Sequence, residues 1–237
     1  MYPSLPLLAA WYGPVLLVLA ALALTKRFRV RWAWAGAAFL AYAVYVGVGH
    51  ATLPADIVTP EARVWSRLAG LAVAAAMTAL ALVASRRVTR KTLGLSLRQR
   101  RGSMPWIALG LGILVLIGAL PGGIATGAPV EAGPLLYHLT LPGVEEELIY
   151  RGLIAGLFAA TLDGEHAIGW GVGLASLLFA LAHAFAAGPD GATTFNLAML
   201  LLTGAAGAVL AFLRLKTGSL LAPAIGHNLL GAALRYL

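Results

Sequence analysis

The chain contains eight runs of predominantly apolar residues, and these runs constrain its fold more than any other feature. A helix needs about 20 apolar residues to cross the ~30 Å hydrocarbon layer of a membrane. A mean hydropathy of +0.87 and a charged fraction of only 11% exclude a soluble domain with a solvated surface. The runs lie at approximately 5–24, 32–53, 65–84, 105–125, 135–160, 168–187, 194–213 and 219–236. We therefore predict an all-α fold, a polytopic membrane bundle of about eight transmembrane helices.

Neither a shift in composition nor an internal repeat divides the sequence. We interpret residues 1–237 as a single integral membrane domain, with N-terminal helices in 1–134 and motif-bearing helices in 135–237. The first run has no basic segment before it and no small-residue cleavage site after it, which predicts a retained anchor instead of a signal peptide. The lack of a repeat also argues against a proton-coupled transporter, because the halves of such transporters typically repeat.

The basic residues indicate how the helices are oriented. The chain has 17 Lys and Arg against 9 Asp and Glu, and most of the basic residues follow the first, third and seventh runs. By the positive-inside rule these loops are cytoplasmic, which places both termini outside. Their position beside apolar runs argues against a nucleic-acid partner. The stretch 88–104 is interpreted as a solvated basic loop or as a short interfacial helix on anionic lipid. The residues in these loops are Lys26, Arg27, Arg29, Arg31, Arg86, Arg87, Arg90, Lys91, Arg98, Arg100, Arg101, Arg214 and Lys216.

Four charged residues interrupt the fifth run, namely Glu145, Glu146, Glu147 and Arg151. Each costs roughly 2.5–3.5 kcal/mol at the membrane centre, so ionisable residues in a span usually mark a functional site. Glu147 and Arg151 share a helix face, which predicts an intrahelical ion pair. Glu146 points toward a different neighbouring helix, so its carboxylate is predicted to be free of the ion pair and available as a general base or acid. Glu145 has no assigned role. The alternative places these charges at an interface or helix N-terminus, beside a break at Pro142–Gly143.

Histidines in two later runs complete the candidate site. His183 follows Phe179 by one helical turn, so the two rings are expected to stack on one face, and His227 lies in the last run. Sites in helical bundles are built from side chains on facing helices, and a neutral imidazole can orient water, donate to an oxyanion or bind a metal. We therefore expect Glu146, His183 and His227 to converge.

Other polar residues support weaker predictions. His50 ends the second run and His138 lies near the start of the fifth, so each is interpreted as interfacial or structural. The chain has no cysteine, which excludes disulfides, thiolate nucleophiles and cysteine-based metal sites.

The candidate residues form three motifs in order, which are Glu146-Glu147-x-x-x-Arg151, Phe179-x-x-x-His183 and the segment 218–227 that ends in His227. Their order and spacing resemble the CPBP (CAAX protease and bacteriocin-processing, or Abi) family of intramembrane endopeptidases. The resemblance covers about 135–237, while the first four helices match only in hydrophobic character. It implies a glutamate-type intramembrane protease that hydrolyses a peptide bond in a membrane-associated or lipidated substrate.

The resemblance also implies roles for individual residues. Glu146 would activate a water, His183 would orient that water, and His227 would help to stabilise the oxyanion. The residues that would support the site are Glu147, Arg151, Phe179 and Asn228.

The sequence departs from the family pattern at Gly231, where the family often has asparagine. Three alternatives follow for the oxyanion donor. His227 acts alone, Asn228 substitutes for the missing amide, or Asn196 on the seventh helix enters the site.

We expect no cofactor, because the sequence lacks a His-Glu-x-x-His helix. The alternative is a Zn²⁺ ion held by Glu146, His183 and His227 with a water as the fourth ligand. The expected partners are a membrane-anchored peptide or protein and the lipid bilayer, and the expected location is the inner membrane of a bacterial or archaeal cell as a multi-pass protein. The competing function is that of a non-catalytic family member, an immunity or scaffold protein.

Overall fold

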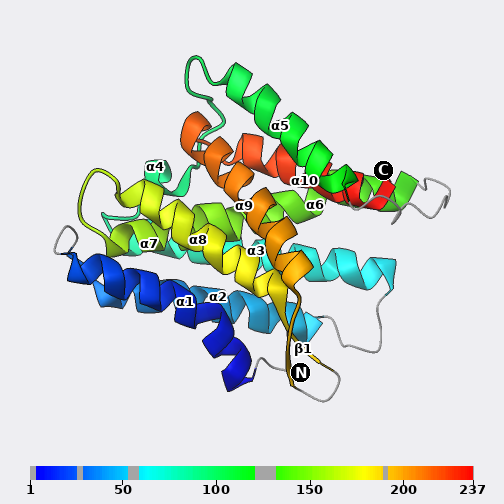
Figure 1. The fold of residues 1–237 in the computed structure, drawn as a ribbon. Helices are drawn as coiled ribbons and strands as arrows, with labels where there is room; N and C mark the ends of the chain where they lie inside the picture. Colours follow the sequence, from blue (N-terminus) through cyan, green and yellow to red (C-terminus); the bar gives the residue numbers. More distant parts are fainter. Residues whose placement is uncertain (1–3, 26–28, 53–58, 121–131, 189–191, 237) are drawn as a thin grey trace.

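The fold was obtained as a computed structural model, which describes residues 4–25, 29–52, 59–120, 132–188 and 192–236. Figure 1 shows a helical bundle in which α8, α9 and α3 lie near the centre and α5 lies at one side with α10. The elements are α1 (Leu5–Leu24), α2 (Trp32–Thr52), α3 (Pro60–Ala84), α4 (Arg90–Leu93), α5 (Met104–Ala119), α6 (Ala132–Glu147), the π-helix η1 (Leu148–Ile154), α7 (Ala155–Thr161), α8 (Ala167–Ala184), β1 (Phe185–Ala187), β2 (Thr193–Phe195), α9 (Leu197–Thr217) and α10 (Leu221–Tyr236).

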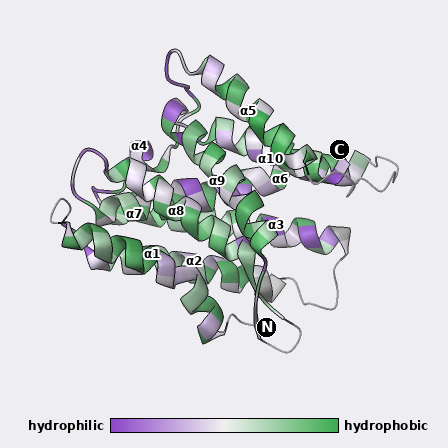
Figure 2. Ribbon diagram, in the orientation of Figure 1, coloured by the Kyte–Doolittle hydropathy of each residue, from purple (hydrophilic) through white to green (hydrophobic). Residues whose placement is uncertain are grey.

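The prediction of an all-α membrane bundle is confirmed, because each predicted apolar run is helical over most of its described length. Five helices, α1, α2, α3, α8 and α9, are long and apolar enough to cross a membrane. Figure 2 shows hydrophobic residues along α1 and α5, and hydrophilic residues in the loops around α4. The predicted ends at 53 and at 121–125 lie outside the described residues.

Several helix boundaries differ by a few residues from the approximate predicted ones, and local capping or strand pairing accompanies the differences. α3 begins at Pro60 instead of 65, because Thr59 caps its N-terminus by accepting a hydrogen bond from the backbone N–H of Ala62. α8 ends at Ala184, and residues 185–187 and 193–195 pair as antiparallel strands. α9 begins at Leu197 after the N-cap Asn196, and it ends at Thr217, before the C-cap Gly218, whose φ of 72° terminates the helix.

The charged segment of the sequence lies in the middle of the bundle. α6, η1 and α7 form one continuous helical rod, and every residue from 149 to 162 is buried. η1 contacts α2, α3 and α8, while α6 contacts α3 and α10. Gly171 on α8 allows α7 to approach closely, because a Cβ at this position would overlap the backbone of Ala159 and the carbonyl oxygen of Ala155. The glutamates are therefore surrounded by helices from both halves of the chain.

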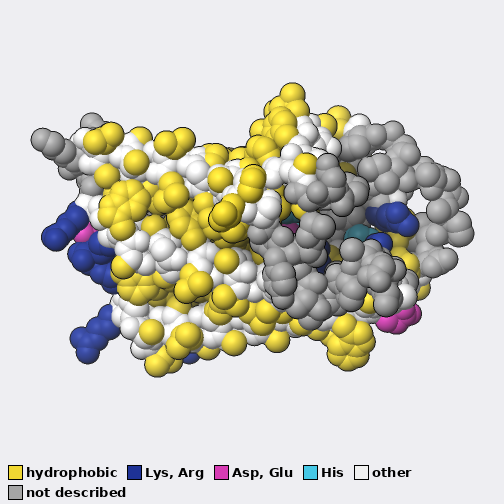
Figure 3. Space-filling model, turned by 90° about the horizontal axis from the view of Figure 1, so that it is seen from below, with side chains coloured by type: hydrophobic (Ala, Val, Ile, Leu, Met, Phe, Trp, Pro, Cys, Tyr) yellow, Lys and Arg dark blue, Asp and Glu magenta, His cyan; other side chains and the backbone are white. Residues whose placement is uncertain are grey.

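The loops that carry basic residues meet at one end of the molecule, where Lys and Arg side chains project together in Figure 3. Asp163, after α7, pairs with Arg31 at 3.2 Å and with Arg87 at 2.8 Å. Arg214 donates hydrogen bonds to the carbonyl oxygens of Lys91 and Thr92. These contacts join loops that the positive-inside rule assigns to the same side. Lys26 and Arg27 lie outside the described residues.

The stretch 88–104 is mostly loop, in agreement with its interpretation as a basic loop and not with the alternative, a short interfacial helix. Only α4 is helical, and its Leu93 is fully buried against Gly156 of α7 instead of facing lipid. Gly94 ends this turn with a φ of 70°.

Asp163→Asn is expected to lower the melting temperature slightly at pH 7. Hydrogen bonds from Arg87 and Arg31 hold the pKa of the Asp163 carboxyl below its ordinary value. A lowered folded-state pKa contributes stability above the unfolded pKa of about 3.9, and this contribution is lost as the pH falls through the lowered value. Differential scanning fluorimetry in detergent should show a difference at pH 7 that shrinks below about pH 4. Glu165→Gln in the same loop is the control. An equal fall in melting temperature in both variants would show that the ion pairs of Asp163 with Arg31 and Arg87 do not stabilise the fold.

Candidate active site

The three glutamates are buried inside an unbroken helix. α6 continues through Pro142, and Glu145, Glu146 and Glu147 are 3%, 7% and 0% exposed. The alternative that placed them at an interface beside a break at Pro142–Gly143 is therefore wrong. A proline inside a membrane helix is tolerated where neighbouring side chains satisfy the backbone groups around it.

Asn228 of α10 supplies this support. Its Oδ1 accepts a hydrogen bond from the backbone N–H of Gly143 at 2.7 Å, and its Nδ2 donates to the carbonyl oxygen of Thr140 at 3.1 Å. The Asn228 amide is thus engaged with the α6 backbone. Asn196 instead caps α9, where its Oδ1 accepts from the backbone N–H of Met199.

Gly143→Ala is expected to destabilise the protein by about 1–3 kcal/mol, because the added methyl group overpacks the contact between α6 and α10. A Cβ at Gly143 would lie 2.6 Å from Asn228 Oδ1 and would also overlap the carbonyl oxygen of Ala224. Gly133→Ala on the same helix is the control, since a Cβ there meets nothing within 4 Å. Thermal unfolding in detergent should separate the two variants, and equal melting temperatures would contradict the close approach.

The predicted ion pair between Glu147 and Arg151 is present in a fully buried position. Arg151 Nη1 lies 2.9 Å from Glu147 Oε1, and the side chains are 0% and 1% exposed. The guanidinium lies over the Phe179 ring, 4.3 Å from its centroid. His227 Nδ1 also contacts Glu147 Oε1, at 2.8 Å. Glu147 therefore orients a cation and a histidine at once.

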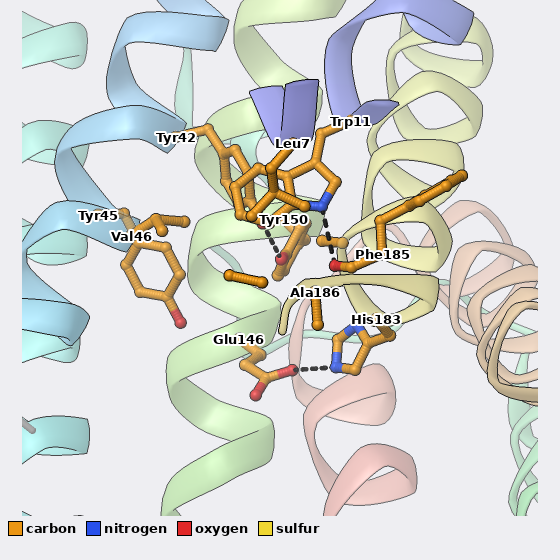
Figure 4. Close-up of a pocket in the computed structure, with 12 residues that line it drawn as sticks. Leu7, Trp11, Tyr42, Tyr45, Val46, Glu146, Tyr150, His183, Phe185 and Ala186 are labelled. Atoms are coloured by element: carbon orange, nitrogen blue, oxygen red, sulfur yellow. Dashed lines mark hydrogen bonds and ion pairs between the residues drawn. The ribbon is translucent and has the colours of Figure 1, made fainter. Parts of the chain in front are cut away.

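Glu146, His183 and His227 converge, as the sequence predicts. Glu146 Oε2 lies 3.6 Å from His227 Nε2 and 4.0 Å from His183 Nε2. Figure 4 shows the Glu146 carboxylate and the His183 ring facing each other across the lower part of the cavity. Phe179 stacks on His183 with 4.4 Å between ring centroids. Among the described residues Glu146 Oε2 has no hydrogen-bond partner, although it is buried.

The hydrogen bonds of the two histidines define their tautomers. His183 Nδ1 lies 2.8 Å from the carbonyl oxygen of Phe179, which can only accept, so Nδ1 carries the hydrogen. His227 Nδ1 faces a carboxylate oxygen of Glu147 in the same way. In the neutral imidazoles both Nε2 atoms are then acceptors. Three acceptor atoms therefore face one space, which only a hydrogen-bond donor can satisfy.

Glu146 is not the free carboxylate that the sequence predicts, and Glu145 is not a bystander. Arg67 Nη1 on α3 lies 2.5 Å from Glu146 Oε1 and 2.7 Å from Glu145 Oε2. Tyr45 of α2 donates a hydrogen bond to Glu145 Oε1 at 2.9 Å. Sequence reasoning missed Arg67, although an arginine inside the third apolar run is the same kind of signal as the glutamates in the fifth.

His138 lies apart from this convergence. The His138 ring packs edge-to-face with those of Tyr137 and Tyr236, and its Nδ1 lies 3.8 Å from the position that a Cβ on Gly231 would take. The side chain of His50 lies outside the described residues.

A cavity of about 370 Å³ opens beside Glu146 and His183. Its walls are largely aromatic and include Trp11, Tyr42 and Tyr45 from α1 and α2. The Trp11 ring holds β1 in place, since its Nε1 donates to the carbonyl oxygen of Phe185 at 3.2 Å (Figure 4). Carboxylate and imidazole thus lie at one edge of a mainly apolar chamber, an arrangement typical of ligand pockets.

An arginine lies beside the residues that were the alternative ligands for a zinc ion. Within the described part of the chain, no group of three or more His, Cys, Asp or Glu side chains is arranged to hold a metal ion. The Arg67 guanidinium, 2.5 Å from Glu146 Oε1, would also repel a dication bound to the same carboxylate.

Comparison with known families gives one match. The model of the type II CAAX prenyl endopeptidase Rce1-like family matches residues 129–233, a segment that includes the motif glutamates, Arg151 and both site histidines. No curated protein and no solved structure matches the chain significantly. Arg67 and the aromatic wall formed by α1 and α2 lie outside the matched segment. Residues 129–233 are therefore similar to the Rce1-like family of type II CAAX prenyl endopeptidases, which confirms the resemblance predicted from the three motifs.

Proposed function

We propose that this protein is an intramembrane endopeptidase that hydrolyses a peptide bond by a glutamate-type mechanism. One observation carries the proposal. Glu146 Oε2 is buried without a hydrogen-bond partner among the described residues, and it faces His227 Nε2 at 3.6 Å and His183 Nε2 at 4.0 Å. A water molecule supplies two O–H donors, one for Glu146 Oε2 and one for His183 Nε2, at hydrogen-bond lengths of about 2.8 Å.

Glu146 acts as the general base in this mechanism. It takes a proton from the water while the water oxygen attacks the carbonyl carbon of the substrate, and His183 Nε2 accepts the other hydrogen of that water and orients it. The tetrahedral intermediate collapses when the C–N bond breaks, and the proton held by Glu146 passes to the leaving amine. No step requires a metal.

His227 stabilises the oxyanion as an imidazolium, after its neutral ring has taken up one proton from the solvent, which it releases when the intermediate has collapsed. Its Nδ1–H is engaged with Glu147 at 2.8 Å, so Nε2 becomes a donor only when the ring is protonated. The Glu147 carboxylate holds the ring through Nδ1, as an orienting carboxylate does for a catalytic histidine. Because the Asn228 amide is bound to the α6 backbone, His227 provides this donor by itself.

The proposed substrate is a membrane-associated peptide that carries a lipid or an apolar segment near the scissile bond. The aromatic cavity beside Glu146 accommodates an apolar group. The matching family acts on prenylated CAAX proteins, so a prenylated peptide is the first substrate to test. The described helices that are long and apolar enough to cross a membrane support a substrate embedded in lipid.

The test uses purified protein in liposomes and an internally quenched farnesylated CAAX peptide. Wild-type protein is expected to cleave the peptide, whereas Glu146→Gln at equal incorporation is expected to be inactive. In parallel, labelling of protein N-termini in membranes of expressing cells should reveal new termini that depend on Glu146. If wild type and Glu146→Gln cleave equally, or if wild type produces neither peptide cleavage nor new termini, a non-catalytic immunity or scaffold role replaces the proposal.

A further inference from the structure

We propose that Arg67, in the N-terminal half of the chain, is a positioning residue that holds Glu146 in its reactive orientation by bridging Glu145 and Glu146. The inference rests on the proposed protease function. It extends the active site beyond the matched residues 129–233, because α3 then contributes to the chemistry through Glu146.

The contacts divide the two oxygens of Glu146 between two tasks. Arg67 Nη1 lies 2.5 Å from Oε1, while Oε2 faces the two imidazoles and has no hydrogen-bond partner among the described residues. A carboxylate with one oxygen held by a charged donor keeps a fixed rotation about its last torsion, which is otherwise broad. The Arg67 contact therefore leaves only Oε2 available to a water.

The bridge also explains why two adjacent carboxylates are buried together. Glu145 and Glu146 are 3% and 7% exposed, and like charges this close disfavour each other's ionised form. Arg67 Nη1 reaches both, at 2.7 Å and 2.5 Å, and so compensates the repulsion with a single guanidinium. If Arg67 were absent, no positive charge would offset the repulsion between the ionised Glu146 and Glu145 in this low-dielectric site.

Arg67 and Glu145 are themselves held in place. Arg67 Nε donates to the hydroxyl of Tyr137 at 3.3 Å, and the Tyr45 hydroxyl donates to Glu145 Oε1 at 2.9 Å. Gly70 lies one turn after Arg67 on α3, and a Cβ there would overlap Glu145 Oε1. The glycine therefore makes room for the carboxylate that shares the guanidinium.

The test measures kcat and KM on the farnesylated peptide in liposomes. Arg67→Met is expected to lower kcat about 100-fold with little change in KM, the effect of misplacing a reacting group. Arg67→Lys keeps the positive charge but lacks the planar guanidinium, so its kcat should be about tenfold higher than that of Arg67→Met. Arg63→Met, one turn earlier on the same helix, is the matched control and should stay within about twofold of wild type.

A double variant separates positioning from a general structural role. Glu145→Gln in the Arg67→Met background removes the charge that Arg67 would otherwise balance, so it should restore kcat about tenfold over Arg67→Met. If Arg67→Met stays within about threefold of wild type, or if Arg67→Lys and the double variant recover nothing, the inference is overturned.

A second substitution tests the same bridge without removing a charge. Gly70→Ala should displace the Glu145 carboxylate and lower kcat about tenfold, whereas Gly36→Ala, where a Cβ meets nothing within 4 Å, should not. This pair decides the question if Arg67→Met does not fold, and unchanged kcat in Gly70→Ala would then overturn the inference. Failure of the protease proposal looks different, because wild type would be inactive or Glu146→Gln fully active.

Discussion

Replacing Glu146 by glutamine is expected to lower kcat/KM for peptide cleavage by roughly 10²–10⁴-fold, the usual contribution of a general base. The amide has nearly the same shape and can still accept a hydrogen bond from Arg67, but it cannot take a proton from water. Its NH₂ group can donate to the Nε2 acceptors of His183 and His227, which lie 4.0 Å and 3.6 Å from Oε2 in the wild type. Cleavage should therefore be lost while the fold is retained, which thermal unfolding of the same preparation checks.

Glu145→Gln is the matched control for this prediction. The two residues are adjacent, both are buried, and both contact Arg67 Nη1. Glu145 bonds Tyr45 and does not face the imidazoles, so its substitution should reduce kcat/KM by at most about tenfold. Equal losses in the two variants would show that the charge of the cluster matters and that Glu146 is not the base.

The second large effect concerns stability. Arg151→Met is expected to destabilise the protein by about 3–5 kcal/mol, because it leaves the carboxylate of Glu147 buried without its cation. Both side chains are almost completely inaccessible, and the guanidinium also packs on the Phe179 ring. Unfolding by SDS in mixed micelles, followed by circular dichroism, would measure the loss.

The double variant Arg151→Met with Glu147→Gln should recover most of that stability, because the unpaired charge is then absent. Replacing both members of a buried pair is often nearly neutral, whereas removing one member is not. His227 would lose the carboxylate that binds its Nδ1, so activity should stay low even when stability returns. A double variant no more stable than Arg151→Met would mean that packing on Phe179, and not the buried charge, dominates.

Local features of this protein could be predicted from its sequence because helical periodicity determines them. The apolar runs correspond to the observed helices, and Glu147 pairs with Arg151 because residues four apart share a face. The stacking of Phe179 on His183 has the same cause. The end of α8 was harder to predict, because the short apolar strand β1 continues the hydrophobic run without a break.

The amino-acid sequence by itself determined the membrane class, the helices, the three motifs and the choice of Glu146, His183 and His227. Only the tertiary structure decided how the charges are shared. Arg67 meets Glu145 across 78 residues, and His227 meets Glu147 across 80. Such contacts depend on which helices pack together and at what height, and a 3.6-residue period carries no information about either. The sequence pattern predicts that the Glu146 carboxylate is free. In the folded protein, Arg67 binds one of its oxygens and the other oxygen faces two histidines.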